Sequence, residues 1–415
     1  MNKQIFDSME YTLDNGIRLI SIKRDTRISS INVGIGVGAI NEKLNEKGIC
    51  HFIEHMLFKG TKNRDNSQIN QDLEERAGSY DAYTDYTSTV FSITALTEEL
   101  EASIEILSDI LINSTFPEEE IEKERGVILS EIKTSIDDIE DYSFSKVHEL
   151  AFERSPLKYD VIGNEENIKK FTRMQLLEFY HRNYIPNKCV ISIVSPYSHN
   201  QIKEMIEMYF VNWTKRTKSK EVIRVEKNKA VEKVSYKSNI EQNTLVYLYT
   251  FHGLTREEEL ALDILNHKLG VSANSILFRE LREERGLAYD IYSEMDATES
   301  IKTLYIYTAV DENNVWEAKK IIEESIEKLK SREIVLKDRD INLMKKIIKT
   351  SIAAILEDSA GLSSYVLHQK LMDKKIDGFV EDLKKLDYIR VDDIYRVAQK
   401  VLRGPTKHIL MSNKN

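Results

Sequence analysis

Two histidines and a glutamate, His51, Glu54 and His55, lie within one five-residue segment. Apolar residues recur around them at helical spacing, so the segment is expected to form a buried amphipathic helix. Residues four apart lie one above the other on a helix, which lets both imidazoles bind one zinc ion. Glu54 would then reach a water on the metal without being a ligand. The order H-x-x-E-H is the inverted form of the H-E-x-x-H zinc-binding signature.

A third ligand is offered by a helix expected to begin at Pro117, where three glutamates follow and suit a helix N-terminus. Within it Glu124 and Glu131 lie seven residues apart, two turns, and therefore point the same way. Glu131 can complete a His/His/Glu site with one position open for water, the arrangement of catalytic zinc. Glu124 can orient a ligand histidine. The plainer alternative is a pair of surface or packing histidines and a solvated acidic helix face.

Several segments carry a family resemblance, beginning with HFIEHMLFKGTKNR from His51, AGSYDAYTDYTSTVF from Ala77 and ERGVILSEI from Glu124. It continues in SPLKYDVIGNEENIKKFT, FYHRNYIPNKCVISIV and, in the second half, FRELREERGLAYDIYS. Together these segments resemble the pitrilysin/insulinase family of zinc peptidases, most closely its short, processing-peptidase-like members. The resemblance covers most of the chain.

The resemblance implies a role for each residue of the predicted site. His51, His55 and Glu131 would bind zinc, one ion per chain. Glu54 would be the catalytic base that takes a proton from water and passes it to the leaving amine. Glu124 would assist catalysis from behind a ligand histidine.

A peptide substrate is expected to add to an exposed strand edge through backbone hydrogen bonds. In the family this edge corresponds to residues 79–84, which places Asp81, Ala82 and Tyr83 beside the peptide. Asp81 stands where an asparagine is usual, and Thr87 where a glutamate is common. Because an ionised aspartate donates no hydrogen bond, we expect this change to favour basic peptides.

The second half is expected to contribute to substrate binding through Arg282 and Tyr289, which match the family's Arg/Tyr segment. From the residues alone, Arg282 belongs to a charged run and Tyr289 suits packing equally well. Larger family members enclose the substrate with four domains, whereas this chain is long enough for two. The resemblance therefore implies a dimer, either a homodimer or a heterodimer with a related chain.

The fold implied by the resemblance is α/β (α+β), with two homologous domains that are each a mainly antiparallel sheet packed with helices. We expect a zinc-binding domain at 1–212 and a second domain, with the Arg/Tyr segment, at 232–415. Residues 213–231 turn polar and lysine-rich, as expected of a linker.

Local signals predict some elements of the first domain. Residues 11–20, with Asn15-Gly16 as the turn, and 31–37 are expected to be strands of a hairpin-like pair. Thr97 is expected to cap a helix over 98–112.

Composition narrows the class of protein. The chain has 415 residues, of which 31% are charged and 8% aromatic, as in soluble globular proteins. No apolar run is long enough to span a bilayer, so no membrane-spanning segment is expected. The N-terminus shows no apolar signal core, so secretion is not expected. Cys50 and Cys189 lie far apart, which favours reduced thiols in the cytoplasm, and Cys50 is expected to be a small buried residue. The net charge of −10, without a basic face, argues against nucleic-acid binding.

The predicted metal site favours a zinc endopeptidase, and the resemblance implies that it cleaves peptides or unstructured precursor segments inside a dimeric chamber. Two alternatives stay open. The chain could be a catalytically weak or inactive peptide-binding or scaffold subunit of a peptidase complex, because some family members lose catalysis and keep the fold. It could also be a metallohydrolase that acts on non-peptide amides.

Overall fold

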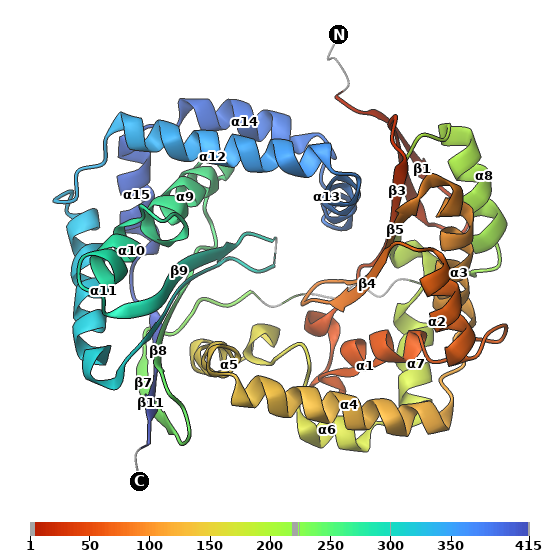
Figure 1. The fold of residues 1–415 in the computed structure, drawn as a ribbon, viewed down its shortest axis with the longest axis horizontal. Helices are drawn as coiled ribbons and strands as arrows, with labels where there is room; N and C mark the ends of the chain where they lie inside the picture. The colour runs from red at the N-terminus through yellow and green to blue at the C-terminus, as the bar shows by residue number, and fades with distance from the viewer. Residues whose placement is uncertain (1–4, 218–222, 224, 299, 414–415) are drawn as a thin grey trace. The chain divides into compact units, whose positions relative to one another are not determined.

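The computed structural model describes residues 5–217, 223, 225–298 and 300–413. It forms two compact units, each built on one β-sheet (Figure 1). The first unit comprises Met1–Lys133, Asp160–Ile223 and Ala353–Asp377, and the second comprises Thr134–Tyr159, Arg224–Ile352 and Gly378–Asn415. The linker predicted at 213–231 includes 218–222 and 224, which lie outside the described residues.

The sheet of the first unit has the strand order β1-β2-β6-β3-β5-β4. Its strands are β1 (Asp7–Thr12), β2 (Arg18–Lys23), β3 (Ile28–Ile35), β4 (Ser79–Thr84), β5 (Thr89–Leu96) and β6 (Cys189–Ser195). Only β2 and β6 pair in parallel; the other neighbours are antiparallel. The prediction of a mainly antiparallel sheet is confirmed, and β4 forms one edge.

Two local predictions for this sheet are wrong. β1 and β2 pair across the turn at Asn15-Gly16, but β3 pairs with β5 and β6 and does not join that hairpin. β3 is buried from its second residue onward, which suits a central strand. Thr97 does not cap the following helix: its hydroxyl shares a hydrogen bond of 2.9 Å with that of Ser29, and α3 begins only at Leu100, after a 3-10 turn.

Helices cover both faces of this sheet. They are α1 (Ile49–Leu57), α2 (Asn66–Glu75), α3 (Leu100–Asn113), most of α4 (Glu118–Asp137), α6 (Glu165–Lys170), α7 (Arg173–Asn183), α8 (His199–Phe210) and α13 (Ser359–Leu371). On one face, α1, α3, α7 and α8 share a core with strand residues such as Ile31 and Phe91. On the other face, Leu362 and Val366 of α13 pack against Ile20 of β2.

The sheet of the second unit has the order β7-β11-β8-β10-β9. Its strands are β7 (Glu232–Lys237), β8 (Asn243–Thr250), β9 (Ala288–Asp296), β10 (Thr303–Val310) and β11 (Thr406–Ser412). Its helices are α5 (Ile139–Ala151), α9 (Arg256–Asn266), α10 (Ile276–Phe278), α11 (Val315–Lys330), most of α12 (Asp338–Glu357), α14 (Gly378–Tyr388) and α15 (Val391–Val401). Only β7 and β11 pair in parallel.

The two sheets repeat one pattern. Matching β2, β6, β3, β5 and β4 with β7, β11, β8, β10 and β9 reproduces both the neighbour order and every strand direction. Each sheet also packs against a helix from the other half of the sequence: α13 lies on β3 and β6, and α5 lies on the equivalent strands β8 and β11. The units are therefore interleaved in sequence, which differs from the continuous ranges expected at 1–212 and 232–415.

The first turn of α1 is held by a buried carboxylate. Gly48, which precedes the helix, has a φ of 93° and no side chain to cap it. Instead, Glu42 accepts hydrogen bonds from the backbone N–H of Gly48 at 3.1 Å and of Cys50 at 2.9 Å. Burial raises the pKa of Glu42 to about 7, although these bonds and the charge of Lys47 lower it. Cys50 is itself fully buried, as predicted.

Replacing Glu42 by Ala should lower the free energy of unfolding by about 3 kcal/mol, because two buried N–H groups lose their acceptor and Lys47 loses a buried counter-charge. Urea titration followed by circular dichroism measures this. Glu46→Ala, which removes an ion pair with Arg182 and a hydrogen bond from the N–H of the exposed Lys43, should cost about 1 kcal/mol. Equal losses in the two variants would contradict a capping role for Glu42.

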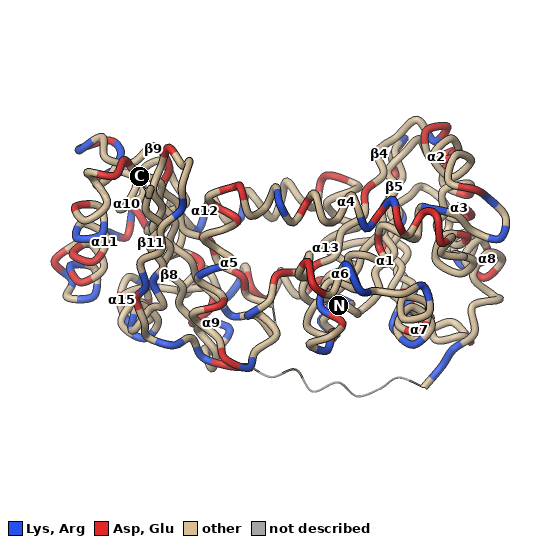
Figure 2. The backbone as a smooth tube through the Cα atoms, turned by 90° about the horizontal axis from the view of Figure 1, so that it is seen from below, with Lys and Arg blue, Asp and Glu red and all other residues tan. Residues whose placement is uncertain are grey.

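Lys, Arg, Asp and Glu are interspersed along the helices of both units (Figure 2). No helix within the described ranges has the length and apolarity needed to cross a membrane.

Candidate metal centre

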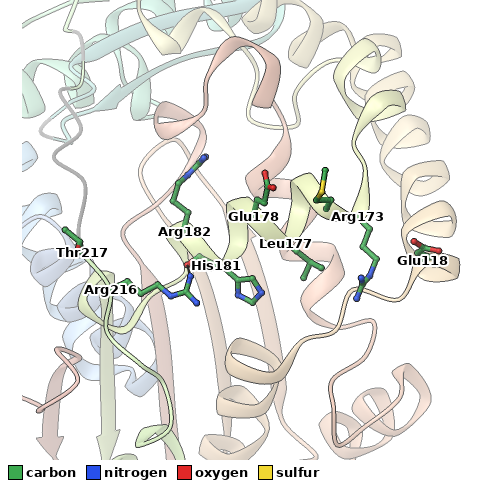
Figure 3. Close-up of a pocket in the computed structure, with 9 residues that line it drawn as sticks. Glu118, Arg173, Leu177, Glu178, His181, Arg182, Arg216 and Thr217 are labelled. Carbon is green, nitrogen blue, oxygen red and sulfur yellow. Dashed lines mark hydrogen bonds between the residues drawn. The ribbon is translucent and has the colours of Figure 1, made fainter.

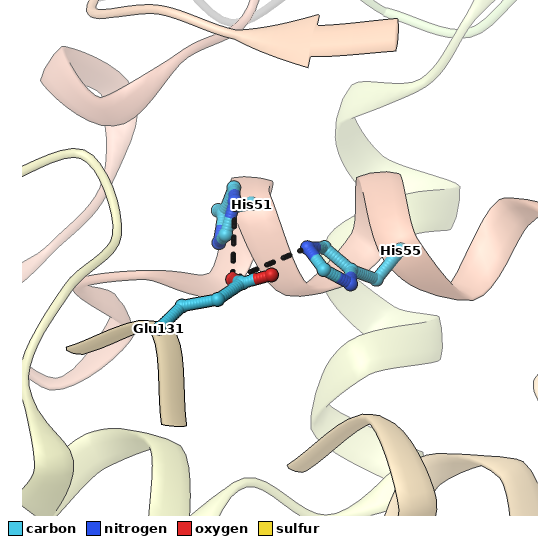
Figure 4. Close-up of side chains that lie close together, drawn as sticks. All are labelled: His51, His55 and Glu131. Atoms are coloured by element: carbon cyan, nitrogen blue, oxygen red, sulfur yellow. Dashed lines mark ion pairs between the residues drawn. The ribbon is translucent and has the colours of Figure 1, made fainter. Parts of the chain in front are cut away.

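His51 and His55 of α1 meet Glu131 of α4 in the first unit (Figure 4). Glu131 Oε2 lies 3.6 Å from His55 Nε2 and 4.0 Å from His51 Nε2. The centroids of the two imidazole rings are 4.7 Å apart. Each residue offers one donor atom, and the three donor atoms lie within 4.8 Å of one another. The described part of the chain holds no other group of three or more His, Cys, Asp or Glu residues arranged in this way.

This donor set suits a zinc ion. Both Nε2 atoms face Glu131, and His55 Nδ1 is engaged elsewhere, so each histidine presents one nitrogen. Burial, and then the neighbouring His55, lower the pKa of His51 to about 4, so its imidazole is neutral and can bind a metal near pH 7. Two imidazoles and one carboxylate leave a fourth position open, as in catalytic zinc sites.

Glu124 supports the site from behind His55. Its Oε2 lies 2.9 Å from His55 Nδ1, and its Oε1 lies 2.9 Å from Lys59 Nζ. Burial raises the pKa of Glu124, but the hydrogen bonds from His55 and Lys59 outweigh burial and lower it below its usual value. Burial lowers the pKa of His55, yet the bond to Glu124 and the charges of Glu131 and Glu54 raise it overall. Glu124 thus fixes the ring with Nε2 toward Glu131.

Replacing Glu124 by Gln should weaken zinc binding by about 10- to 100-fold, because a ligand histidine loses its ionised partner. Competition with a chromophoric chelator measures the affinity. Glu122→Gln on the same helix, where Glu122 pairs with Arg125 at the surface, is the matched control and should bind zinc like the wild type. If both variants bind zinc equally, Glu124 has no part in the site.

Glu54 lies beside this group without belonging to it. Its Oε2 accepts a hydrogen bond of 2.7 Å from the Thr84 hydroxyl. Burial raises the pKa of Glu54, and the carboxylates of Asp81 and Glu131 add to the rise, whereas Thr84 and His55 oppose it. A raised carboxyl pKa suits a group that takes up a proton and returns it near neutral pH.

A pocket of about 280 Å³ opens next to Glu54 and His55. Its lining comes from α1, the following loop, α2 and β4: Glu54, His55, Phe58, Lys59, Asn70, Tyr80, Asp81 and Ala82. β4 is the edge strand of the sheet, so within the described ranges one side of its backbone has no strand neighbour. The candidate metal-binding group, the candidate base and the pocket therefore adjoin one strand edge.

The residues of β4 predicted to contact a peptide divide between two faces of the sheet. Ala82 packs toward the core that includes α1, and Tyr83 packs toward α13. The Tyr83 hydroxyl lies 2.8 Å from His368 Nε2. Alternation along the strand puts Asp81, which is exposed, on the same face as Tyr83. Thr87 lies in the turn after β4, where its hydroxyl bonds Asp85.

Arg282 and Tyr289 lie together in the second unit. Arg282 is the fourth residue of a π-helical turn, Arg279–Glu283, and Tyr289 is the second residue of β9. The Arg282 guanidinium lies 5.7 Å from the centroid of the Tyr289 ring and 5.0 Å from that of Phe278. Tyr289 is 75% exposed, so it does not serve as a core residue.

A larger cavity, of about 790 Å³, lies elsewhere in the first unit (Figure 3). Arg173, Leu177 and His181 line it from successive turns of α7, and Arg216 lies beside His181. Arg173 donates to the carbonyls of residues 115 and 116, and Arg216 donates to that of His181, so these cations anchor the chain. None of the three candidate metal ligands lines this cavity.

Sequence reasoning missed Lys59 and Thr84. Lys59 lies four residues after His55 but in the loop after α1, so helical spacing does not place it near Glu124. Thr84 carries no signal either, because its contact with Glu54 depends on how β4 packs against α1.

Two family models match the chain. The model for insulinase (peptidase family M16) matches residues 18–165, a range that contains His51, Glu54, His55, Glu124 and Glu131. The model for the peptidase M16 inactive domain matches residues 170–346. The sequence is also 29% identical over 390 residues to the uncharacterized zinc protease YmxG of Bacillus subtilis, covering 93% of this chain and 94% of that protein. It is 36% identical over 214 residues to the beta subunit of the mitochondrial-processing peptidase of Dictyostelium discoideum, covering 51% of this chain and 46% of that one.

Solved structures share the fold. A protease from Helicobacter pylori superposes with a TM-score of 0.92 at 20% identity and covers 99% of this chain and 100% of its own. A peptidase M16 inactive domain from Pseudomonas fluorescens superposes with a TM-score of 0.89 at 15% identity, covering 99% and 98%. The predictions of a pitrilysin/insulinase relative and of a two-domain α/β fold are confirmed. The chain belongs to the insulinase family of peptidases, family M16.

Proposed function

We propose that this protein is a zinc-dependent endopeptidase that cleaves peptides or unstructured precursor segments. The observation that carries the proposal is the convergence of His51, His55 and Glu131, with donor atoms within 4.8 Å of one another, beside Glu54. Relatives named zinc proteases and the insulinase family model support it.

In this proposal the peptide adds as a strand to the free edge of β4, where backbone hydrogen bonds hold it regardless of side chains. His51, His55 and Glu131 would hold one zinc ion per chain, which would supply Lewis-acid chemistry toward a water and the peptide carbonyl. Glu54 takes a proton from the attacking water and gives it to the leaving amine. Glu124 keeps the ring of His55 oriented.

Side-chain preference would come from β4 and from the second unit. Asp81 and the excess of acidic residues in the first 212 residues, 36 against 23 basic ones, favour basic peptides. Ala82 and Tyr83 follow Asp81 along the same strand. Arg282 and Tyr289 would hydrogen-bond substrate carbonyls, which suits a guanidinium that lies near the rings of Phe278 and Tyr289.

Replacing Arg282 by Ala should lower kcat/KM for a peptide by about 10-fold, the loss expected for a hydrogen bond to a charged donor. The matched control is Arg279→Ala, which removes a guanidinium of the same segment that pairs with Glu284. Steady-state kinetics on one peptide compare the two variants. Equal kcat/KM values in both would exclude Arg282 from substrate binding.

We further propose that two chains, identical or related, form a dimer around the substrate and that the protein acts in the cytoplasm. The two-domain length and the likeness to one subunit of the mitochondrial-processing peptidase support the dimer. Two buried free thiols, Cys50 and Cys189, support the reducing compartment. If light scattering gives the molar mass of a single chain for a sample that has full peptidase activity, the proposed dimer is contradicted.

The test of the proposed function is mass-spectrometric mapping of the products from a peptide library, with and without a chelator. We expect internal cleavages that disappear with the chelator and return with added zinc. Cleavage that persists in the chelator would contradict the proposal.

One alternative has a specific observation in its favour, because residues 170–346 match a domain model named inactive. In that case the chain is a peptide-binding or scaffold subunit with little or no catalysis. An equimolar zinc content without cleavage of any library peptide would select this alternative. The metal-binding residues, however, all fall within the range of the other model.

A further inference from the structure

The last residue of β4, Thr84, contacts the candidate base directly. Its hydroxyl donates to Glu54 Oε2 at 2.7 Å, and no other hydrogen bond reaches the Glu54 carboxylate from the described residues. Ala82 packs toward α1, so alternation along the strand also points Thr84 toward this helix. One carboxylate oxygen is therefore held by the strand, and the other remains available to a water.

The backbone around Thr84 is fixed by contacts on both sides. Thr84 pairs with Thr89 of β5, and the turn between them is closed by Asp85, whose Oδ1 accepts from the N–H of Thr87 at 2.6 Å and of Ser88 at 2.7 Å. On the opposite face, the preceding residue Tyr83 bonds His368 of α13. The hydroxyl thus occupies one place relative to α1.

A glutamate side chain has three rotatable bonds, and its last one is only weakly restricted. Without a partner, the carboxylate would sample several orientations, and only some of them would direct an oxygen at the attacking water. A hydrogen bond from a rigid strand selects one orientation. Because β4 is also the edge that would receive the peptide, the same strand would set both the peptide and the base.

We propose that Thr84 is a positioning residue that holds the Glu54 carboxylate in its reactive orientation. This inference rests on the proposed function, since it assigns a role within that reaction. Thr84 itself does not exchange a proton with the substrate.

The test compares three variants by kcat, KM, zinc content and crystal structure. Thr84→Val replaces the hydroxyl by a methyl group of similar size, and Thr84→Ser keeps the hydroxyl. Thr94→Val is the control, because it removes a hydroxyl from β5 that bonds Ser30 and does not reach the site.

We expect Thr84→Val to lose about 10-fold or more of kcat, the range for a hydrogen bond to a charged group, with KM and zinc content unchanged. Its crystal structure should show the Glu54 carboxylate turned or in several conformers. Thr84→Ser should recover most of the rate, and Thr94→Val should match the wild type.

A wild-type kcat in Thr84→Val, or a serine variant as slow as the valine variant, would overturn the inference while the peptidase function stands. A loss of zinc from Thr84→Val would also overturn it, because the residue would then act on the ligands. If the wild type cleaves no peptide, the proposed function fails; the Glu54 conformation in Thr84→Val still decides whether Thr84 holds the carboxylate.

Discussion

Glu54→Gln is expected to bind zinc as the wild type does and to lose about 100-fold or more of its turnover. Gln has the same shape and still accepts a hydrogen bond from Thr84, so the substitution removes the basicity of the carboxylate and leaves the contact in place. The candidate metal-binding group does not include Glu54, so zinc should stay bound in this variant. The measurements are kcat on one peptide and zinc per chain by atomic absorption.

Glu74→Gln is the matched control for this prediction. Glu74 is an exposed glutamate of α2, so its replacement makes the same change of charge away from the site. It should leave kcat and zinc content unchanged. A wild-type rate in Glu54→Gln would show that another group serves as the base.

Glu131→Gln is expected to weaken zinc binding by at least about 100-fold, more than the loss typical of a residue that only orients a ligand. Glu131 is the single carboxylate in the group, and without it two neutral imidazoles face the ion alone. Competition with a chromophoric chelator measures the affinity, and peptidase activity should fall with zinc occupancy.

The matched control for Glu131→Gln is Glu119→Gln. Glu119 is an exposed residue of the same helix, α4, so its replacement makes the same change of charge. This variant should bind zinc like the wild type. If Glu131→Gln retains the wild-type affinity, the third ligand has been misassigned.

Helical periodicity accounts for the part of the site that could be predicted from the sequence. The spacing of His51 and His55 and that of Glu124 and Glu131 fix which side chains share a face of α1 and of α4. Periodicity does not show that these faces of α1 and α4 contact each other, because the helices are about seventy residues apart in sequence. The family resemblance supplied that link.

Contacts between elements that are distant in sequence could not be predicted, for a physical reason. The sequence of an amphipathic helix such as α13 or α5 shows which face is buried but not which sheet that face packs against. The packing of each helix on the sheet from the other half of the sequence could therefore not be predicted. The position of β3 between β5 and β6 is a similar case, since a buried strand fits several neighbours equally well. Thr84 was missed because one hydroxyl has no pattern of its own.

The most direct test is a crystal structure of the zinc-loaded protein with anomalous scattering measured on both sides of the zinc absorption edge. We expect one anomalous peak per chain, with His51 Nε2, His55 Nε2 and a carboxylate oxygen of Glu131 about 2.0 to 2.2 Å from it and Glu54 outside the ligand set. A peak elsewhere, or Glu131 directed away from the two histidines, would contradict the metal centre on which the proposed peptidase depends.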